Sequence, residues 1–323
     1  VKGGAMMWQA TKRQWTPVSD EGLSSDDMIE VAGGGTGKAL ESTSHAPEDT
    51  AADTALFTAE NIALCLMSMR FMTGKYPQTR SMLDALQRKV MLRAHQPFTS
   101  RDIGRCLYGM QCMSISSDQK GRLNNAARIL TGKIAVKLEQ MEGELMARDI
   151  GSALYGLKSS RIRKEIKRKG RVGAEGNKRD DKSKLENSKE IELEIEDSEK
   201  EIKQLLNVLA KCIAFSPNTA LNAQSMGMAL LGMRGMSSDA REVQQVLHAL
   251  TPRLKVSTLD GQACAKILNS MSNMSSGRGD VRHFLSALAP KIAACVQENS
   301  GGFTPQEICN SFYGLQNMDS KHV

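Results

Sequence analysis

The sequence predicts an all-α fold, an α-solenoid of about six two-helix repeats with a period of about 40 residues. Aromatic residues make up only 4% of the chain whereas methionine occurs 19 times, and this composition disfavours β-sandwiches and barrels. Apolar residues recur at the spacing of one helix face within a short motif. Six copies of that motif align, at 57–69, 98–110, 145–157, 221–233, 259–271 and 303–315.

Each copy of the motif predicts the first helix of a hairpin. A side chain that can cap a helix N-terminus occupies the second motif position in most copies. These residues are Thr58, Thr99, Asn222, Asp260 and Thr304. Thr99 with Asp102, and Thr304 with Glu307, fit a capping box or its aspartate equivalent. Pro305 then stands at the first helical position, where its missing N–H is tolerated.

Two motif positions hold small residues, many of them glycine. One comprises Ala63, Gly104, Gly151, Gly227 and Ala265, and the other Ser68, Gly109, Gly156, Gly232, Ser270 and Gly314. Glycine inside a helix costs roughly 1 kcal/mol relative to alanine, so its recurrence predicts that a neighbouring helix backbone approaches closely. The alternative is that the first helix is short and the glycines mark its end.

A turn and a second helix follow the motif. The second helix is predicted from apolar residues at helical spacing after Met236 and again after Met274. Asp239 and Glu242 are expected to cap one of these helices. Pro252 and Pro290 share one position near the end, where they are expected to kink or terminate the helix. Because one hairpin cannot bury its own apolar face, stacked neighbours must build the core.

Two segments lie outside the repeats. Residues 1–55 lack a sustained period and are expected to form a disordered tail before a solenoid over 56–323. The chain opens with Val1 and stops inside a repeat, so we expect a fragment truncated at the C-terminus. Residues 161–201 form an insertion that is first basic and then acidic. It is expected to be a solvated loop, or alternatively a basic arm that helps to hold nucleic acid.

The sequence predicts no enzyme, cofactor, metal site or small-molecule substrate. The glycine-rich run 31–39 lacks the first glycine and the final hydroxyl of a phosphate loop, which favours a flexible linker. The five histidines show no metal-ligand spacing, and no run of 18 apolar residues predicts a membrane span. The seven cysteines occur singly, which is typical of buried thiols in a reducing intracellular compartment.

Two polar columns could bind nucleic acid. The first lies near the end of the second helix and comprises Lys89, Lys133, Arg253 and Lys291, with Lys211 one residue off. Stacking would turn it into a basic stripe for phosphates. The second follows the motif and comprises Arg70, Gln111, Lys158, Arg234, Ser272 and Gln316. Because the side chain at this position varies between repeats, it suits contact with one base edge per repeat. The alternative is a solvated flank whose charges complement the dipole at the helix C-terminus.

The repeat has the form T-x-x-[DE]-I-x-x-x-L-Y-G-[LM]-x-x-M, then Ser-Ser-Asp, then [VL]-x-x-[FV]-L-x-A-L-x-P-[KR]-[IL]. It resembles the degenerate helical-hairpin repeats of organellar RNA-binding proteins over 57–318 with the insertion excluded. The octotricopeptide and heptatricopeptide classes are the nearest, including proteins with a RAP domain and the RNA-editing substrate-binding complexes. The resemblance implies RNA binding in a mitochondrion or chloroplast.

Three functions are compatible with these observations. The first is a helical-repeat protein that binds single-stranded RNA along its concave or basic face and acts in organellar RNA processing, stability or translation. The second is a protein–protein interaction scaffold, which the low aromatic content favours because RNA-binding proteins often stack bases on aromatic rings. The third is the regulatory repeat region of a larger enzyme.

Overall fold

The computed structural model describes residues 58–92, 97–113, 125–160, 162, 199–215, 220–297, 302–319 and 321. These residues are helical apart from short connections and one isolated bridge between Ile162 and Met236. The labelled helices are α2 (Ala59–Ser68), α3 (Pro77–Leu92), α4 (Ser100–Gly109), α5 (Asn125–Glu139), α6 (Ala147–Tyr155), α8 (Ala223–Met233), α9 (Arg241–Val256), α10 (Gly261–Ser270), α11 (Gly279–Gln297) and α12 (Pro305–Gly314). A further helix spans 199–215.

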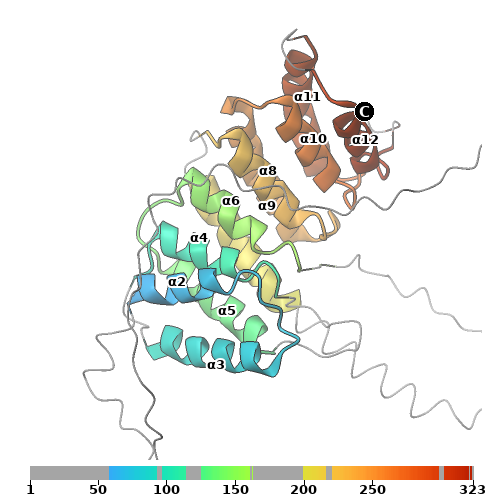
Figure 1. The fold of residues 1–323 in the computed structure, drawn as a ribbon. Coiled ribbons are helices and arrows are strands. Elements are labelled where there is room, and N and C mark those ends of the chain that lie inside the picture. The colour runs from blue at the N-terminus through green and yellow to red at the C-terminus, as the bar shows by residue number, and fades with distance from the viewer. Residues whose placement is uncertain are drawn as a thin grey trace, which may run out of the picture. The chain divides into compact units, whose positions relative to one another are not determined.

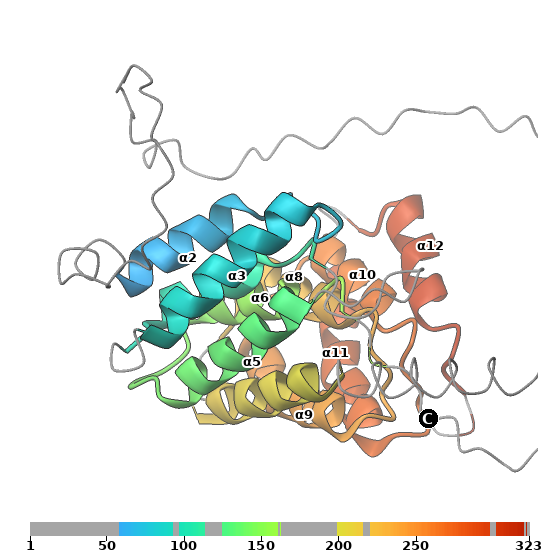
Figure 2. The same cartoon turned by 90° about the horizontal axis from the view of Figure 1, so that it is seen from below.

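The helices alternate between two layers, which we call the A helices and the B helices. The A helices are α2, α4, α6, α8, α10 and α12, and each packs against the next. The B helices are α3, α5, helix 199–215, α9 and α11. Helix 199–215 is joined to α5 by the Arg128–Glu201 ion pair and to α9 by a hydrogen bond between Arg253 and Ile213. Stacked sequential pairs confirm the predicted all-α helical repeat (Figure 1 and Figure 2).

Glycines bring successive A helices into backbone contact. A Cβ added at Gly109, Gly156, Gly232 or Gly314 would overlap a main-chain carbonyl of the preceding A helix. The overlapped carbonyls belong to Leu66, Leu107, Leu154 and Leu268, which share one motif position. This confirms the predicted close approach. The alternative also holds at this motif position, because α4 and α12 end at Gly109 and Gly314 and Gly156 is the C-cap of α6, in a right-handed conformation with φ of −56° and ψ of −23°.

The predicted caps of the A helices are confirmed. Thr58, Thr99, Asn222, Asp260 and Thr304 each accept a hydrogen bond from a backbone N–H three residues on. Both capping boxes are present. The cap predicted for α9 is wrong, because Ala240 precedes that helix without a side-chain bond. The carboxylate of Asp239 instead accepts from Arg278 at 2.8 Å, in the turn of the next repeat.

The two prolines do not end their helices. Pro252 lies inside α9, which continues to Val256, and Pro290 lies inside α11, which continues to Gln297. Of the two predicted effects, termination of the second helix is therefore wrong, and a kink stays a prediction. Each sits beyond the middle of its helix, so only one hydrogen-bonded turn loses a donor while tertiary packing holds the rest.

Aliphatic and sulfur side chains form one core that runs through all the described repeats. It includes the methionines that end the motif, and Met110, Met233 and Met271 are at most 1% exposed. The prediction that the cysteines are buried holds for Cys106, Cys264 and Cys295. It is wrong for Cys65 and Cys309, which are exposed on α2 and α12, where the described residues place an A helix on one side only.

Several sequence predictions fall outside the described residues. They include the tail 1–55 with its glycine-rich run and nearly all of the insertion 161–201. Ile162, at the start of the insertion, is buried, and its carbonyl accepts from Ser237 at 3.0 Å. Residues 199–201 belong to the B helix of the third hairpin. The insertion therefore separates the two helices of that hairpin, as its position in the repeat predicted.

Candidate nucleic-acid interface

The predicted basic column does not form a continuous exposed stripe. Arg253 is fully buried, and its Nε and Nη2 donate to the carbonyl oxygen of Ile213 at 3.2 and 3.0 Å. Burial lowers the pKa of Arg253, and Glu144 opposes this shift. The side chain ties α9 to helix 199–215, so it presents nothing to a ligand, contrary to its predicted role as a surface phosphate contact.

The other members of that column are at least partly exposed. Lys89, Lys133 and Lys291 are half-buried and Lys211 is exposed. Burial lowers the pKa of Lys133. These four side chains lie near the C-terminal ends of four B helices, with Arg253 interrupting the row.

Carboxylates accompany many cations of the B helices and their turns. Ion pairs join Arg128 to Glu201 at 3.2 Å, Lys203 to Glu199 at 3.5 Å and Arg278 to Asp239 at 2.8 Å. His248, which is exposed, approaches Asp280 at 3.4 Å. Three of these four contacts tie one repeat to the next, so much of the basic charge in this layer serves the stacking of hairpins.

The predicted base-contacting column is also divided. Gln111 and Ser272 are buried, whereas Arg70, Lys158 and Arg234 are half-buried and Gln316 is exposed. A ladder of side-chain bonds runs along this column, in which a residue one place further on donates to the column's backbone carbonyl in the preceding repeat. Ser159 donates to the Gln111 carbonyl, Asn273 to that of Arg234 at 2.7 Å, and Asn317 to that of Ser272 at 2.5 Å.

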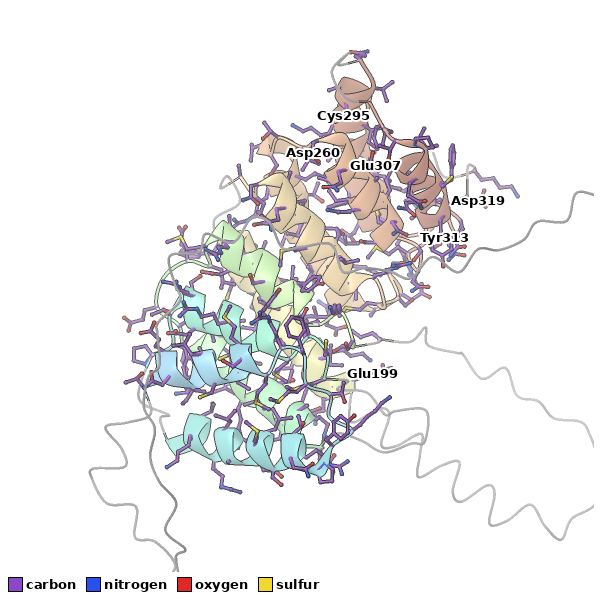
Figure 3. All side chains as sticks on the ribbon, viewed as in Figure 1. Glu199, Asp260, Cys295, Glu307, Tyr313 and Asp319 are labelled. Carbon is purple, nitrogen blue, oxygen red and sulfur yellow. The ribbon has the colours of Figure 1, made fainter. Side chains whose placement is uncertain are left out.

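The cations of this second column lie against aromatic rings. The Lys158 ammonium is 4.5 Å from the centroid of the Tyr155 ring and donates to its hydroxyl at 3.1 Å. The Arg70 guanidinium lies 4.6 Å from the centroid of Phe71, and that of Arg234 lies 5.9 Å from the centroid of Tyr313. Figure 3 labels Tyr313 on α12, near the end away from Glu307.

Two of the tyrosines also stack on each other. The rings of Tyr108 and Tyr155 occupy the same motif position in successive repeats, with centroids 5.7 Å apart and an interplanar angle of 24°. Both side chains are half-buried, so part of each tyrosine remains accessible to solvent. The repeat therefore places a stacked aromatic pair beside the Lys158 ammonium at the C-terminal ends of α4 and α6.

These residues belong to a wider surface, which we call the A-face. It comprises the solvent-facing motif positions 4, 8 and 11 of the A helices together with the first residue after each motif. Its cations are Arg70, Arg101, Arg105, Arg148, Lys158, Arg234 and Lys266. Its single carboxylate is that of Glu60, which pairs with Arg105 at 3.3 Å. The A-face therefore holds a large excess of positive charge.

Sequence reasoning missed four of these cations. Arg101, Arg105, Arg148 and Lys266 lie outside the two columns chosen from the sequence, and none of them is buried. A signal for them existed, because positions 4 and 8 lie about two turns and one turn before position 11 and must share its face of the helix. A search for positive charge along the whole helix face, rather than at single positions, would have found them.

The A-face has the chemistry of a site for flexible polyanions. Guanidinium and ammonium groups bind phosphates, and exposed aromatic faces stack unpaired bases. Within the described ranges, no three His, Cys, Asp or Glu side chains gather as a metal site would require. No helix in the same ranges is both long and apolar enough to cross a membrane.

Comparison of the chain with protein-family models, curated proteins and solved structures gave no match.

Proposed function

We propose that this chain binds single-stranded RNA along the A-face. The observation that carries the proposal is the stacked pair Tyr108–Tyr155 beside the Lys158 ammonium, within a surface whose cations greatly outnumber its carboxylates. Stacking on tyrosine requires a base with a free face, which a duplex does not offer along its length. The arginines on either side of the pair then meet the phosphates that connect such bases.

The geometry favours stacking over base-edge recognition. A code of one base per repeat needs an accessible side chain in every repeat, and Gln111 and Ser272 are buried. One of the three donors of the Lys158 ammonium is engaged by the Tyr155 hydroxyl, which orients this side chain toward the ring. We therefore propose binding that tolerates many sequences, with modest preferences where Arg234 and Gln316 are reached.

The alternative explanation, in which cations complement helix dipoles, accounts for fewer of the cations on the A-face than RNA binding does. A dipole effect acts within the last turn of a helix. Arg101 and Arg148 stand in the first turns of α4 and α6, where the dipole disfavours positive charge. Their place on the A-face calls for a different partner, and a phosphate backbone supplies one.

A comparison of two matched charge reversals tests the proposal. Lys158→Glu with Arg234→Glu alters the A-face, and Lys211→Glu with Lys291→Glu alters the B helices by the same net charge. Binding of a fluorescent mixed-sequence single-stranded RNA is titrated at several salt concentrations. The A-face variant is expected to lose about tenfold in affinity at physiological salt and to lower the salt slope by about 1 to 2. The B-helix variant is expected to bind like the wild type.

Three results would contradict this proposal. Equal losses of RNA affinity in both variants would mean that only net charge matters. A larger loss in the B-helix variant would mean that RNA binds at the column of Lys89, Lys133, Lys211 and Lys291. Wild-type binding that disappears at physiological salt would leave only background attraction by the net charge of +7. The scaffold function would then take precedence.

The compartment that we propose is based on the resemblance of the repeat motif to organellar RNA-binding repeats. We propose that the RNA is a mitochondrial or plastid transcript, which the protein helps to process, stabilise or translate. The test is localisation of the product of the full-length transcript carrying a C-terminal fluorescent tag. A signal confined to the cytosol or nucleus would reject the organellar assignment and leave the RNA-binding proposal intact.

A further inference from the structure

Two thiols meet where the end of α11 packs against the start of α10. The Cys295 thiol donates to the Leu259 carbonyl at 3.3 Å, just before Asp260, the cap of α10. Cys264 closes the first turn of α10, where its N–H donates to the Asp260 carbonyl at 3.0 Å. Figure 3 labels Cys295 and Asp260 at the same end of the two helices. Burial raises the pKa of Cys264 to about 12 and the neighbouring Cys295 thiol adds to this shift, so the two thiols are in direct contact.

The preceding hairpin makes the same contact without thiols. Ser257 and Met226 stand there at the repeat positions of the two cysteines. The Ser257 hydroxyl accepts from the Leu221 N–H at 3.1 Å, and Leu221 is the repeat equivalent of Leu259. The contact is thus built into the repeat. Cys264 is the only cysteine at the sixth position of the six motif copies, so the pairing of two thiols is particular to the fifth hairpin.

The end of α11 is positioned to open without unfolding of the repeat. Pro290 lacks an N–H, so the helix loses one hydrogen bond just before this end. Beyond Pro290, Cys295 is the only residue of α11 that is buried, and the helix ends soon afterwards at Gln297. Helix ends open at low free energy. Cys295 is 8% exposed and Cys264 is fully buried, so a small oxidant reaches Cys295 first.

We propose that Cys264 and Cys295 are a modification site at which a hydroperoxide forms a reversible disulfide that fastens the end of α11 to α10. The Cys295 thiolate attacks the peroxide, which breaks the O–O bond, leaves a sulfenic acid and releases an alcohol, or water from hydrogen peroxide. The Cys264 sulfur then attacks the sulfenic sulfur and expels water. The two thiols together lose two electrons and two protons, which the hydroperoxide takes up. This site is separate from the A-face and does not depend on the RNA proposal.

Charges near the pair limit the reaction to the open state. While the end of α11 is closed, burial raises the pKa of Cys264, and Cys295 and Asp260 add to the shift, which keeps this thiol protonated and slow to react. Lys291 opposes the shift. It lies one turn before Cys295 on the same face of α11. Its ammonium therefore stays beside Cys295 when the helix end opens and favours the thiolate that attacks the peroxide.

Mass spectrometry of the oxidised chain tests the proposal. The intact chain is incubated with hydrogen peroxide, free thiols are alkylated, and trypsin is combined with a protease that cleaves after glutamate, so that Cys295 and Cys309 fall on different peptides. A linked pair of Cys264 and Cys295 is expected to be at least about tenfold more abundant than any other cysteine pair, because the fold holds these two thiols together. Dithiothreitol is expected to reverse it. Cys106, which is equally buried and whose pKa is raised by burial and Asp102, is expected to remain a free thiol.

Matched variants and the Tm complete the test. Cys295→Ser introduces the residue found at Ser257 and is expected to abolish the linked pair, whereas Cys309→Ser, at an exposed cysteine, is expected to leave it unchanged. The oxidised wild type is expected to unfold several degrees above the reduced wild type, because the bond constrains the unfolded chain. Cys295→Ser is expected to show no such difference.

Three results would overturn the proposal. The first is oxidation of Cys295 to a sulfinic acid without a linked pair, and the second is a mixture of linkages among several cysteines, as an unfolded chain would give. The third is a linked pair of Cys264 and Cys295 that leaves the Tm unchanged or lower, because the bond would then not fasten α11 to α10.

Discussion

At the residue scale, the glycines of α8 provide a matched pair that separates backbone contact from helix propensity. A Cβ at Gly232 would overlap the Leu154 carbonyl, whereas a Cβ at Gly227 would meet nothing closer than Lys266 at 3.9 Å. Gly232→Ala is expected to destabilise the protein by about 2–3 kcal/mol, because α8 must move away from α6. Gly227→Ala is expected to be neutral or to stabilise by up to about 1 kcal/mol.

Urea unfolding of the two variants measures this difference in the free energy of unfolding. Ser270 shows that a hydroxyl side chain is accommodated at the equivalent position of α10, where it turns back to bond the Lys266 carbonyl at 2.7 Å. If Gly232→Ala leaves the free energy of unfolding unchanged, the A helices adjust their spacing freely. Close backbone contact would then not explain why glycine recurs at this motif position.

At the element scale, Arg253 acts as a link between B helices. Arg253→Met keeps much of the aliphatic volume but leaves the Ile213 carbonyl without its two donors. We expect a loss of about 2–3 kcal/mol in the free energy of unfolding, measured by urea denaturation. Lys291→Met, at the same repeat position in α11 but half-buried, is expected to change stability little.

The same pair also reports on function. If Arg253 is purely structural, the folded fraction of Arg253→Met binds RNA as tightly as the wild type. A specific loss of RNA affinity without a loss of stability would reverse this assignment and support the original basic column.

The contrast between Arg253 and Lys291 shows which features could be predicted from the sequence and which could not. The period of the motif and its capping residues were sufficient to predict the A helices, because both signals are local. Burial of a polar side chain depends on what the neighbouring repeat offers, here the Ile213 carbonyl. The same limit applies to Asp239, which the sequence predicted as a cap and which instead binds Arg278 of the next turn.

The A-face illustrates a second limit. Lys158 and Arg234 were predicted as site residues from their position after the motif, but their pairing with Tyr155 and Tyr313 depends on side-chain orientation. The Arg234–Tyr313 pair even joins repeats that are not adjacent in sequence. Sequence periodicity places residues on a face, and it does not determine which side chains on that face meet.

At the scale of the whole molecule, a core lined with thiols makes stability depend on pH. Burial raises the pKa of Cys264 to about 12, with Cys295 adding to the shift, and burial with Asp102 raises the pKa of Cys106. A raised pKa in the folded chain favours the protonated thiol. The contribution of the buried thiols to the free energy of unfolding is therefore complete below the ordinary pKa of 9.0. It is lost progressively as the pH rises above that value.

Two lysines, Lys133 and Lys137, act in the opposite direction. Burial lowers the pKa of Lys133 and Lys137, so the unfavourable burial of their charge is relieved as the pH rises towards the ordinary value of 10.5. The pH dependence of the wild type alone therefore mixes two effects. Comparison with a variant that lacks the thiols isolates the contribution of Cys106 and Cys264.

The repeat itself supplies suitable replacements for this test. Alanine occupies the position of Cys106 in the next two repeats, at Ala153 and Ala229, and Cys264→Val keeps a similar volume in an otherwise aliphatic column. Above the ordinary pKa of 9.0, each thiol that ionises only in the unfolded chain costs about 1.4 kcal/mol per pH unit. Between pH 8 and pH 10 under a reducing agent, the Tm of the wild type is therefore expected to fall by several degrees more than that of Cys106→Ala with Cys264→Val. Parallel Tm curves would mean that the thiols reach solvent in the folded chain, and the continuous packing between repeats would then be looser than the structure indicates.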